Sequence, residues 1–523
     1  MNLLERYRKA VSDRSEWINI YQEVGKYVWP NARNIVKAVK TPDNGQILTT
    51  EIADSTAIKA ALRMTSGIFS YLMPVGVKWF DLRPREEKFL SDMTIARRAS
   101  KATQSVHSAI WRSNFQREMF SNIRSLCVFG TGCISVELVG TELVFRNYHI
   151  ADIFFEENSK GQIDTVFRRF FWTARQMIQE FGLDAVSDTV RTAYETKNFS
   201  DKFECVHCVY PREDYDTGKA DYKGMPFASE YYETQSEQKL KEGGFKRNPY
   251  RIGRFDQSPD ELMGRSPAMD ALPDIKMLNK MRYTFVMGSE LQALPPILLE
   301  DDSVITQPVI GPLASLYYRA GSSKPEPMKI GVNAQLTDQL IQQERQNISE
   351  QFYNDLFQAL ADYHNMTAYE VSQRVEEKLV MLAPSITGLQ KGQYDPLIMD
   401  CYMLLTEAKQ IEPIGVNVDI TYQGRLALAM SNMQTSAIEL TMAKWSPYQQ
   451  FYPVLDNMDM DKAFRVSAIN TGVPADVLRD EQDVAETRSE AKQVQQAAQM
   501  AEIAATGSQA IKNVQGTALE QMI

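Results

Sequence analysis

Two stretches near the middle of the chain carry apolar side chains at the three- and four-residue spacing of an amphipathic helix. The first follows Ser266 and Pro267, which suit an N-cap and an N1 position, and Pro273, which suits the first turn of a longer helix. No proline interrupts it from Asp274 to Pro295, which predicts a helix of about twenty residues, roughly 30 Å long. Its predicted apolar face consists of Leu278, Met281, Phe285, Leu291 and Gly288, where another helix could approach closely.

The second stretch, Leu336–Tyr363, predicts another long helix. The segment between the two, Ile297–Met328, contains proline and glycine and has no clear periodicity. Together they predict a helical hairpin with an elaborated tip. A third long helix is expected from Thr367 to about Ala383–Pro384, resuming to Gln410. The apolar side of the second helix is predicted to hold Leu336, Leu340, Ile348, Phe352, Leu356, Leu360 and Tyr363.

The N-terminal half mixes helical patterns with the period-two patterns typical of strands, which predicts an α+β fold that is mainly α. Helices are expected over 2–29, Thr50–Leu72, 86–120 and Phe120–Phe129, the last ended by Gly130. Strands are expected over Cys133–Leu138, Glu142–Asn147, Ile150–Glu156, Gln162–Trp172, Phe203–Tyr210, Glu230–Thr234 and Val416–Tyr422, with a short strand ending at Pro84 and a Lys/Gly-rich turn near Leu240–Gly244. From Asp483 the chain has few large apolar residues, so this segment is either disordered or a helix that needs partners.

Composition narrows the function classes. The 523 residues are 44% hydrophobic and 24% charged, as in an ordinary folded protein. The net charge of −10 excludes a chain that grips nucleic acid through bulk positive charge. No apolar run reaches the length of about eighteen residues that a membrane helix needs, and the N-terminus has no signal-peptide core. Five scattered cysteines fit free thiols and a reducing compartment during synthesis.

Motifs that carry catalysis or bind metals are missing. The sequence contains no GxxxxGK[ST], GxSxG or HExxH pattern. On a strand, Cys205 and Cys208 would point to opposite faces, and no second CxxC exists, so buried structural cysteines are favoured over zinc. Asp456, Asp459 and Asp461 have the wrong spacing for a calcium loop and favour a solvated acidic turn. We therefore expect no catalytic residue, no metal, no cofactor and no enzyme.

Four stretches resemble the head-to-tail connector, or portal, proteins of short-tailed bacteriophages. The most specific is Asn248–Asn279, NPYRIGRFDQSPDELMGRSPAMDALPDIKMLN, and the second is Met366–Pro396, MTAYEVSQRVEEKLVMLAPSITGLQKGQYDP. Ala57–Trp79 and Gly161–Gly182 add weaker support. Together these stretches touch most of the chain from about residue 1 to 430, and they occur in the same order as in the family. The tail beyond residue 480 shows no specific match.

The resemblance implies a structural portal protein. Such proteins form a ring, expected to be a dodecamer, at one capsid vertex, and double-stranded DNA passes through it during packaging and ejection. The implied partners are further copies of the chain, the terminase motor, the major capsid and scaffolding proteins and tail adaptor proteins, with no membrane. The implied location is the virion, after assembly in the host cytoplasm. The acidity of the chain fits this function, because tight phosphate binding would impede DNA translocation.

The family architecture has a wing, a stem, a clip and a crown. The resemblance assigns a wing of helices and β-strands to residues 1–245, a wing-to-stem segment with the descending stem helix to 246–296, a clip to 297–335, the ascending stem helix to 336–363, a tunnel loop and long wing helix to 364–410, a helical crown to 411–480, and an Ala/Gln-rich helical or disordered extension to 481–523.

Candidate residues follow from this assignment. The candidates to face DNA in the channel are Lys324, Lys329, Arg345, His364, Asn365 and Met366, although a solvated surface charge is the more common situation for each cation. The stem-packing candidates are Leu278, Met281, Phe285 and Gly288. Two other classes stay open. A tail adaptor or internal core protein would lack the two long helices around a clip, and a DNA-packaging enzyme is disfavoured by the missing P-loop.

Overall fold

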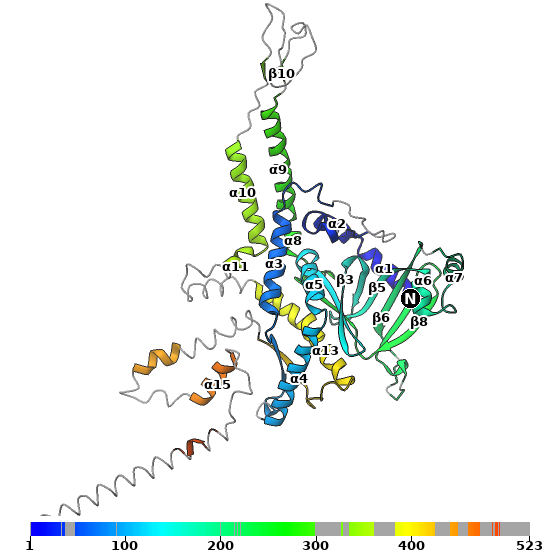
Figure 1. The fold of residues 1–523 in the computed structure, drawn as a ribbon, viewed down its shortest axis with the longest axis vertical. Helices are drawn as coiled ribbons and strands as arrows, with labels where there is room; N and C mark the ends of the chain where they lie inside the picture. Colours follow the sequence, from blue (N-terminus) through cyan, green and yellow to red (C-terminus); the bar gives the residue numbers. More distant parts are fainter. Residues whose placement is uncertain are drawn as a thin grey trace, which may run out of the picture. The chain divides into compact units, whose positions relative to one another are not determined.

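The computed structural model (Figure 1) confirms an α+β fold that is mainly α. It describes residues 2–295 apart from 33, 37–47, 90–91, 199, 214, 217 and 220, and then 297–298, 326–327, 334–359, 382–423, 440–447, 459–470, 484, 487–489 and 491. The chain divides into two compact units. The first combines residues 1–77 with 106–411, and the second combines 78–105 with 412–523.

Several predicted N-terminal helices are shorter than expected. The helix expected over residues 2–29 is two helices, because the buried Arg14 between them donates hydrogen bonds to the carbonyls of Ile150 (2.6 Å) and Ile153 (2.9 Å). The helix expected over 86–120 is also divided and starts later. The observed helices are α1 (Leu3–Asp13), α2 (Ser15–Val28), α3 (Thr56–Leu72), α4 (Met93–Arg112) and α5 (Phe115–Phe129), with short 3₁₀ turns at Pro30–Ala32, Glu87–Phe89, Ile150–Asp152 and Tyr222–Gly224.

Eight strands of the first unit form two antiparallel sheets, with the strand orders β4-β5-β6-β7-β8 and β3-β2-β9. The turn expected near Leu240–Gly244 is wrong, because these residues lie in β8 and pair with β7, with Lys241 opposite Tyr231. Strand β9 was not predicted. The strands are β2 (Thr131–Val139), β3 (Glu142–Tyr148), β4 (Ile153–Glu157), β5 (Ile163–Thr173), β6 (Lys202–Pro211), β7 (Phe227–Glu233), β8 (Lys239–Phe245) and β9 (Tyr250–Arg254).

Helices cover both faces of the five-stranded sheet. On one face, Cys208 packs with Leu4 and Tyr7 of α1. On the other face, Cys205 packs with Met177 of α6 (Ala174–Phe181) and Val190 of α7 (Asp188–Glu195), two helices that the sequence reading missed. The two cysteines therefore point to opposite faces, as predicted, and burial raises the pKa of both thiols. All five cysteines are free and buried.

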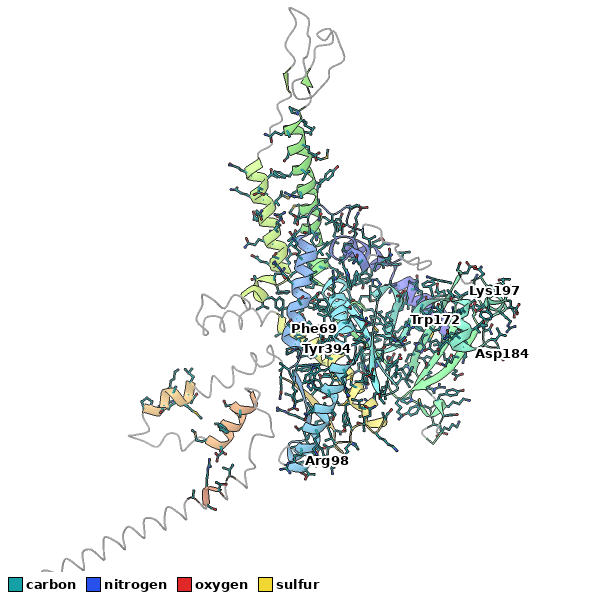
Figure 2. The ribbon with its side chains drawn as sticks, viewed as in Figure 1. Phe69, Arg98, Trp172, Asp184, Lys197 and Tyr394 are labelled. Carbon is teal, nitrogen blue, oxygen red and sulfur yellow. The ribbon has the colours of Figure 1, made fainter. Side chains whose placement is uncertain are left out.

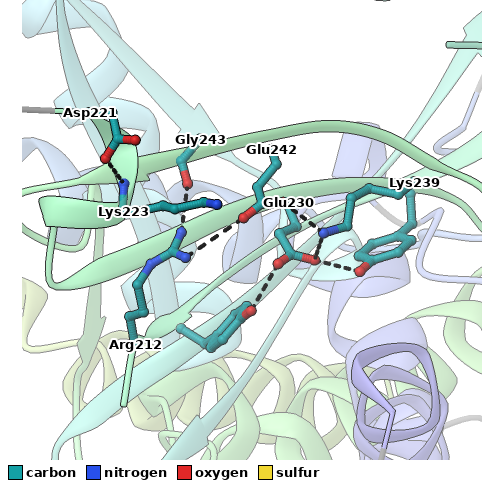
Figure 3. A network of polar contacts seen from close by, with 9 residues as sticks. Arg212, Asp221, Lys223, Glu230, Lys239, Glu242 and Gly243 are labelled. Atoms are coloured by element: carbon teal, nitrogen blue, oxygen red, sulfur yellow. Dashed lines mark hydrogen bonds and ion pairs between the residues drawn. The ribbon is translucent and has the colours of Figure 1, made fainter. Parts of the chain in front are cut away.

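A polar network connects the last three strands of this sheet (Figure 3). The buried carboxylate of Glu230 accepts hydrogen bonds from the hydroxyls of Tyr210 (2.9 Å) and Tyr232, and lies 3.3 Å from Nζ of Lys239. Lys239 also pairs with Glu242 at 2.9 Å. Because both oxygens of Glu230 have donors, its burial costs less than that of an unpaired carboxylate. The network holds the edge strand β8 in place.

A broken helix fastens the three-stranded sheet. Helical residues 382–389 continue into a π-helical turn, Gln390–Tyr394, and then into α13 (Asp395–Glu407). The fully buried Gln393 donates hydrogen bonds from Nε2 to the carbonyls of Gly132 (3.2 Å) and Arg251 (3.0 Å). It thereby bridges β2 and β9. Figure 2 labels its buried neighbour Tyr394.

The second unit is described more sparsely. Strand β1 (Phe80–Pro84) pairs antiparallel with β12 (Val418–Tyr422), the strand predicted over Val416–Tyr422. The buried Trp79 stacks on Tyr422, with ring centroids 6.3 Å apart. A further helix, α15, covers Met460–Asn470.

Candidate functional site: a helical hairpin and its anchor

The predicted hairpin exists. Helix α9 (Leu272–Ala293) and helix α10 (Ala334–Gln351) lie side by side, and the short strands β10 (Ile297–Leu298) and β11 (Glu326–Pro327) pair beyond them (Figure 1). The predicted start is confirmed too. Short helix α8 (Pro267–Asp270) precedes α9, and the hydroxyl of Ser266 accepts a hydrogen bond from the backbone N–H of Met269 at 3.3 Å. Proline at N1 and a serine N-cap therefore act as expected.

The second helix of the hairpin is shorter than predicted. The expected helix Leu336–Tyr363 is interrupted after Gln351, and α11 (Asn354–Ala359) follows. The break is set by Tyr353, which has a φ of 53°, a left-handed conformation that an α-helix cannot contain. Ile348, Phe352 and Leu356 are buried as predicted, whereas Leu336 and Leu340 are exposed. Leu360 and Tyr363 lie outside the described residues.

One segment between α2 and α3 anchors both helices of the hairpin. Oδ1 of the buried Asn279, in α9, accepts hydrogen bonds from the backbone N–H groups of Ala53 (2.9 Å) and Asp54 (3.2 Å). The carboxylate of Asp54 accepts two hydrogen bonds from the guanidinium of Arg345, in α10, at 2.6 and 3.0 Å. Sequence reasoning missed Asp54 and Asn279, because no local pattern marks a residue that binds a distant helix.

The charge on Asp54 is stabilised by its partners. Its Oδ1 also accepts a hydrogen bond from the backbone N–H of Thr56 at 2.9 Å, next to the start of α3. Burial alone would raise the pKa of Asp54, but the hydrogen bonds from Thr56 and Arg345 outweigh burial and lower it. Asp54 therefore stays ionised while it holds α10.

Just before the hairpin begins, the chain packs backbone against backbone at Gly130 and Gly264; we call this contact the root of the hairpin. A Cβ atom added to Gly130 would lie 2.1 Å from the carbonyl oxygen of Gly264, and one added to Gly264 would lie 2.3 Å from that of Gly130. Gly130 ends α5 with a φ of 72°, as the sequence predicted for a glycine at a helix C-terminus. The hydroxyl of Thr131 accepts a hydrogen bond from the N–H of Gly264 at 2.9 Å, and that of Ser266 donates to Val128 at 2.8 Å.

An acidic pocket of about 500 Å³ lies at the base of the hairpin. Its walls include the carboxylates of Asp256, Asp270, Asp274 and Glu350, and the cation Arg265. Arg265 is already paired with Glu261 at 2.5 Å. Burial raises the pKa of Asp270, Arg265 opposes this shift and Asp256 adds to it. The base of the hairpin therefore repels anions.

The outward side of α9 exposes a row of large apolar side chains. The exposed fractions are 62% for Tyr283, 43% for Met287, 42% for Leu291 and 78% for Leu294. Their spacing of four residues places Tyr283, Met287 and Leu291 on one stripe of the helix, and Leu294 follows directly after α9 ends at Ala293. We call these four residues the α9 stripe.

The predicted inner face of α9 needs one correction. Leu278 is buried, and Met281, Phe285 and Gly288 are half-buried. Leu291, expected on that face, belongs instead to the exposed α9 stripe. The reason is that each step of three residues falls about 60° short of a full turn at about 3.6 residues per turn, so two such steps rotate Leu291 away from the face.

The predicted channel candidates fall into two groups. Arg345 is ion-paired with Asp54, so its described role is structural. Lys324, Lys329, His364, Asn365 and Met366 lie outside the described residues. Within the described part of the chain, no three acidic, cysteine or histidine side chains are placed to hold a metal ion. No described helix is long and apolar enough to cross a membrane.

Comparison with known proteins identifies the family. The family model for the bacteriophage head-to-tail connecting protein matches residues 1–478. The chain belongs to this family. The matched residues include both helices of the hairpin and the segment around Asp54 that anchors them.

Two curated relatives of this head-to-tail connecting protein extend along nearly its whole length. It is 26% identical to the probable portal protein of Bordetella phage BPP-1 over 526 residues, which covers 97% of this chain and 93% of the relative. It is 26% identical to the portal protein of Salmonella phage epsilon15 over 535 residues, which covers 98% of this chain and 95% of the relative. The protein is therefore a structural connector of the phage particle.

Proposed function

We propose that this connector assembles into a closed ring, expected to be a dodecamer, at one vertex of the capsid, and that double-stranded DNA enters and leaves the head through its centre. The hairpin would form the stem, residues 1–245 the wing, 297–335 the clip and 411–480 the crown. The ring would bind the terminase motor during packaging and the tail adaptor proteins afterwards, and would be incorporated with capsid and scaffolding proteins in the host cytoplasm. Two relatives named portal proteins support this proposal.

The α9 stripe is the observation that carries the ring proposal. Apolar residues exposed on a helix at this spacing are typical of a face that packs against another helix. Burying a side chain the size of leucine or methionine contributes about 1.5–3 kcal/mol. Covering the four exposed side chains of the α9 stripe would therefore stabilise an assembly in which a neighbouring copy packs against them. In a ring, each copy contacts the next through two different surfaces, and the stripe would be one of them.

Charge substitutions in the stripe test this proposal. In the double variant Met287→Glu, Leu291→Glu, the introduced carboxylates would have to be buried unpaired, so the ring should dissociate to smaller species in native mass spectrometry. Leu183→Glu is the control for a charge introduced at an exposed apolar residue, because Leu183 is exposed to a similar extent (45%) but lies outside the hairpin. Rings in the control and not in the stripe variant support the proposal, whereas intact rings in both would show that the stripe is not the contact.

Gly288 tests the packing of the proposed stem separately from the α9 stripe, because it lies on the half-buried side of α9. It is half-buried and lies one residue after Met287 in α9. Gly288→Leu should crowd the approach of a neighbouring helix and block ring assembly, while Gly288→Ala should be tolerated. An intact ring for Gly288→Leu in gel filtration would count against a stem role for this part of α9.

A further inference from the structure

Helix α4 carries an unusual charge pattern for this chain. The chain as a whole has a net charge of −10, yet the 20 residues of α4 include no aspartate or glutamate. They include four exposed cations: Arg97, Arg98, Lys101 and Arg112. Among the residues that the structure describes, none of the four has an ion-pair partner, whereas the nearby Arg85 is paired with Asp419.

The four cations share one face of the helix. At about 100° per residue they fall within an arc of about 100°, and Arg97 and Arg112 are about 22 Å apart along the axis. The same face presents hydroxyl and amide side chains from Thr94, Gln104, Ser105 and Ser108. The opposite face is buried, through Ala99, Ala102, Val106 and Ile110. Figure 2 labels Arg98, near the N-terminal end of the helix.

The helix holds this face in place without using its cations. Asp92 caps the N-terminus by accepting a hydrogen bond from the backbone N–H of Thr94 at 2.8 Å. Thr103, on the buried side, accepts a hydrogen bond from the backbone N–H of Leu82 in β1 at 3.0 Å. The side chains of Arg97, Arg98 and Lys101 therefore have no described structural role, and Arg112 only donates a hydrogen bond from Nε to the carbonyl of Ser108 on its own helix at 3.2 Å. All four cations are presented on a fixed helix.

We propose that this basic face of α4 binds the phosphate backbone of duplex DNA without reading its sequence. Guanidinium, ammonium and hydroxyl groups are the donors that proteins direct at phosphates, and sequence reading would require contacts to base edges instead. An axial span of about 22 Å corresponds to about six base pairs at about 3.4 Å each, enough for two or three phosphates on one strand to meet the four cations.

An acidic protein segment is the competing ligand, and the face fits it less well. Interfaces between proteins have an apolar centre with a polar rim. The centre of the α4 face is cationic. Among the side chains of α4 that the structure describes, Trp111 is the one large apolar side chain that is exposed, and it lies at the margin of this face. The inference does not require the ring, and it goes beyond a passive conduit, because it gives an otherwise acidic connector one defined surface that holds DNA.

Fluorescence anisotropy with a short labelled DNA duplex tests this inference on the full-length chain. The test variant is Arg97→Glu, Arg98→Glu, Lys101→Glu. The matched control is Lys160→Glu, Arg175→Glu, Lys219→Glu, which reverses three exposed cations that form no ion pair with the described residues and changes the net charge by the same amount. Native mass spectrometry and thermal unfolding of both variants establish that assembly and folding are kept.

The wild-type chain and the control should bind DNA, with an affinity that falls steeply as salt increases. The α4 variant should lose most of this binding at low salt, and its salt slope should fall by about two to three, since each lost phosphate contact removes about 0.9 from the slope. Equal loss in both variants, or no binding by the wild type at low salt, would overturn the inference. Binding of a labelled poly-glutamate peptide in preference to DNA would overturn it in favour of an acidic protein ligand.

Discussion

The carboxylate of Asp54 accepts two hydrogen bonds from Arg345, which lies 291 positions later in the chain. The same residue donates its backbone N–H to Asn279 in α9. A single residue in the connection before α3 thus contacts both helices of the hairpin. Because its side chain is almost fully buried (4% exposed), loss of the arginine would leave a poorly compensated carboxylate.

Arg345→Ala should lower the free energy of unfolding by about 2 kcal/mol, the usual contribution of a hydrogen bond to a buried charge. Arg345→Lys should recover part of this loss, because it keeps the charge but not the two donors. Urea unfolding at fixed protein concentration, followed by tryptophan fluorescence, measures both. An effect of Arg345→Ala no larger than that of the exposed Arg175→Ala would contradict the anchor role.

The ion pair between Asp54 and Arg345 also predicts how stability changes as the solution becomes acidic. The folded-state pKa of Asp54 is lowered, so its contribution is present above the unfolded-state pKa of about 3.9 and is lost as pH falls through the folded-state value. The difference in stability between the wild type and Asp54→Asn should therefore be large at neutral pH and shrink below about pH 4. A difference that stays constant over this range would mean that the charge of Asp54 contributes nothing.

Gly130→Ala should be far more destabilising than a glycine replacement at a similar backbone angle elsewhere. Gly130 and Gly140 have φ values of 72° and 65°, so alanine is strained at both. Only at Gly130 would the new Cβ meet backbone, the carbonyl oxygen of Gly264. Gly140→Ala should cost about 1 kcal/mol. Gly130→Ala should cost several times as much and reduce the yield of folded protein, and similar melting temperatures for the two variants would argue against the tight root.

The buried His207 provides a second, separate reason for the folded state to lose stability in acid. Its ring is buried, lies 2.6 Å from the hydroxyl of Tyr250 and 2.8 Å from that of Ser229, and stacks on Tyr231. Burial, with Arg168 and Lys241 adding to it, lowers the pKa of His207 well below 6.5. The unfolded chain therefore takes up a proton below about pH 6.5 that the folded chain does not, so stability falls as pH falls, by at most about 1.4 kcal/mol per pH unit.

Replacing the histidine isolates this effect. His207→Gln removes the titrating group while keeping a polar side chain that can bond to the two hydroxyls. It should lower stability at pH 7.5 and flatten the dependence on pH between about 6.5 and 5 relative to the wild type. Parallel pH profiles for the two proteins would show that His207 does not cause the acid sensitivity.

The sequence predicts local features well where the pattern is long. Helix α9 and its start at Ser266 and Pro267, the end of α5 at Gly130 and the opposite orientations of Cys205 and Cys208 all follow from spacing and residue type. Strand β8 was missed because only Leu240 of its polar, glycine-containing sequence is deeply buried, and pairing with β7 overrides its weak strand propensity. The breaks at Arg14 and Tyr353 were missed because tertiary contacts and one left-handed residue set them.

The anchor could not be predicted for a different reason. Arg345 was recognised as a candidate on the second helix of the hairpin, but its partner is separated from it by 291 positions, and no helical or strand period links the two. The contact between Gly130 and Gly264 likewise depends on how two loops meet. The exposed α9 stripe could have been predicted from the sequence. This requires counting the two three-residue steps that rotate Leu291 away from the inner face of the helix.

Native mass spectrometry of the purified wild-type chain, with negative-stain electron microscopy, is the most direct test of the connector as a ring. The proposal predicts closed rings, expected to contain twelve subunits, with an open central hole. A chain that stays monomeric across a wide range of protein concentrations, including conditions that nucleate assembly, would contradict it.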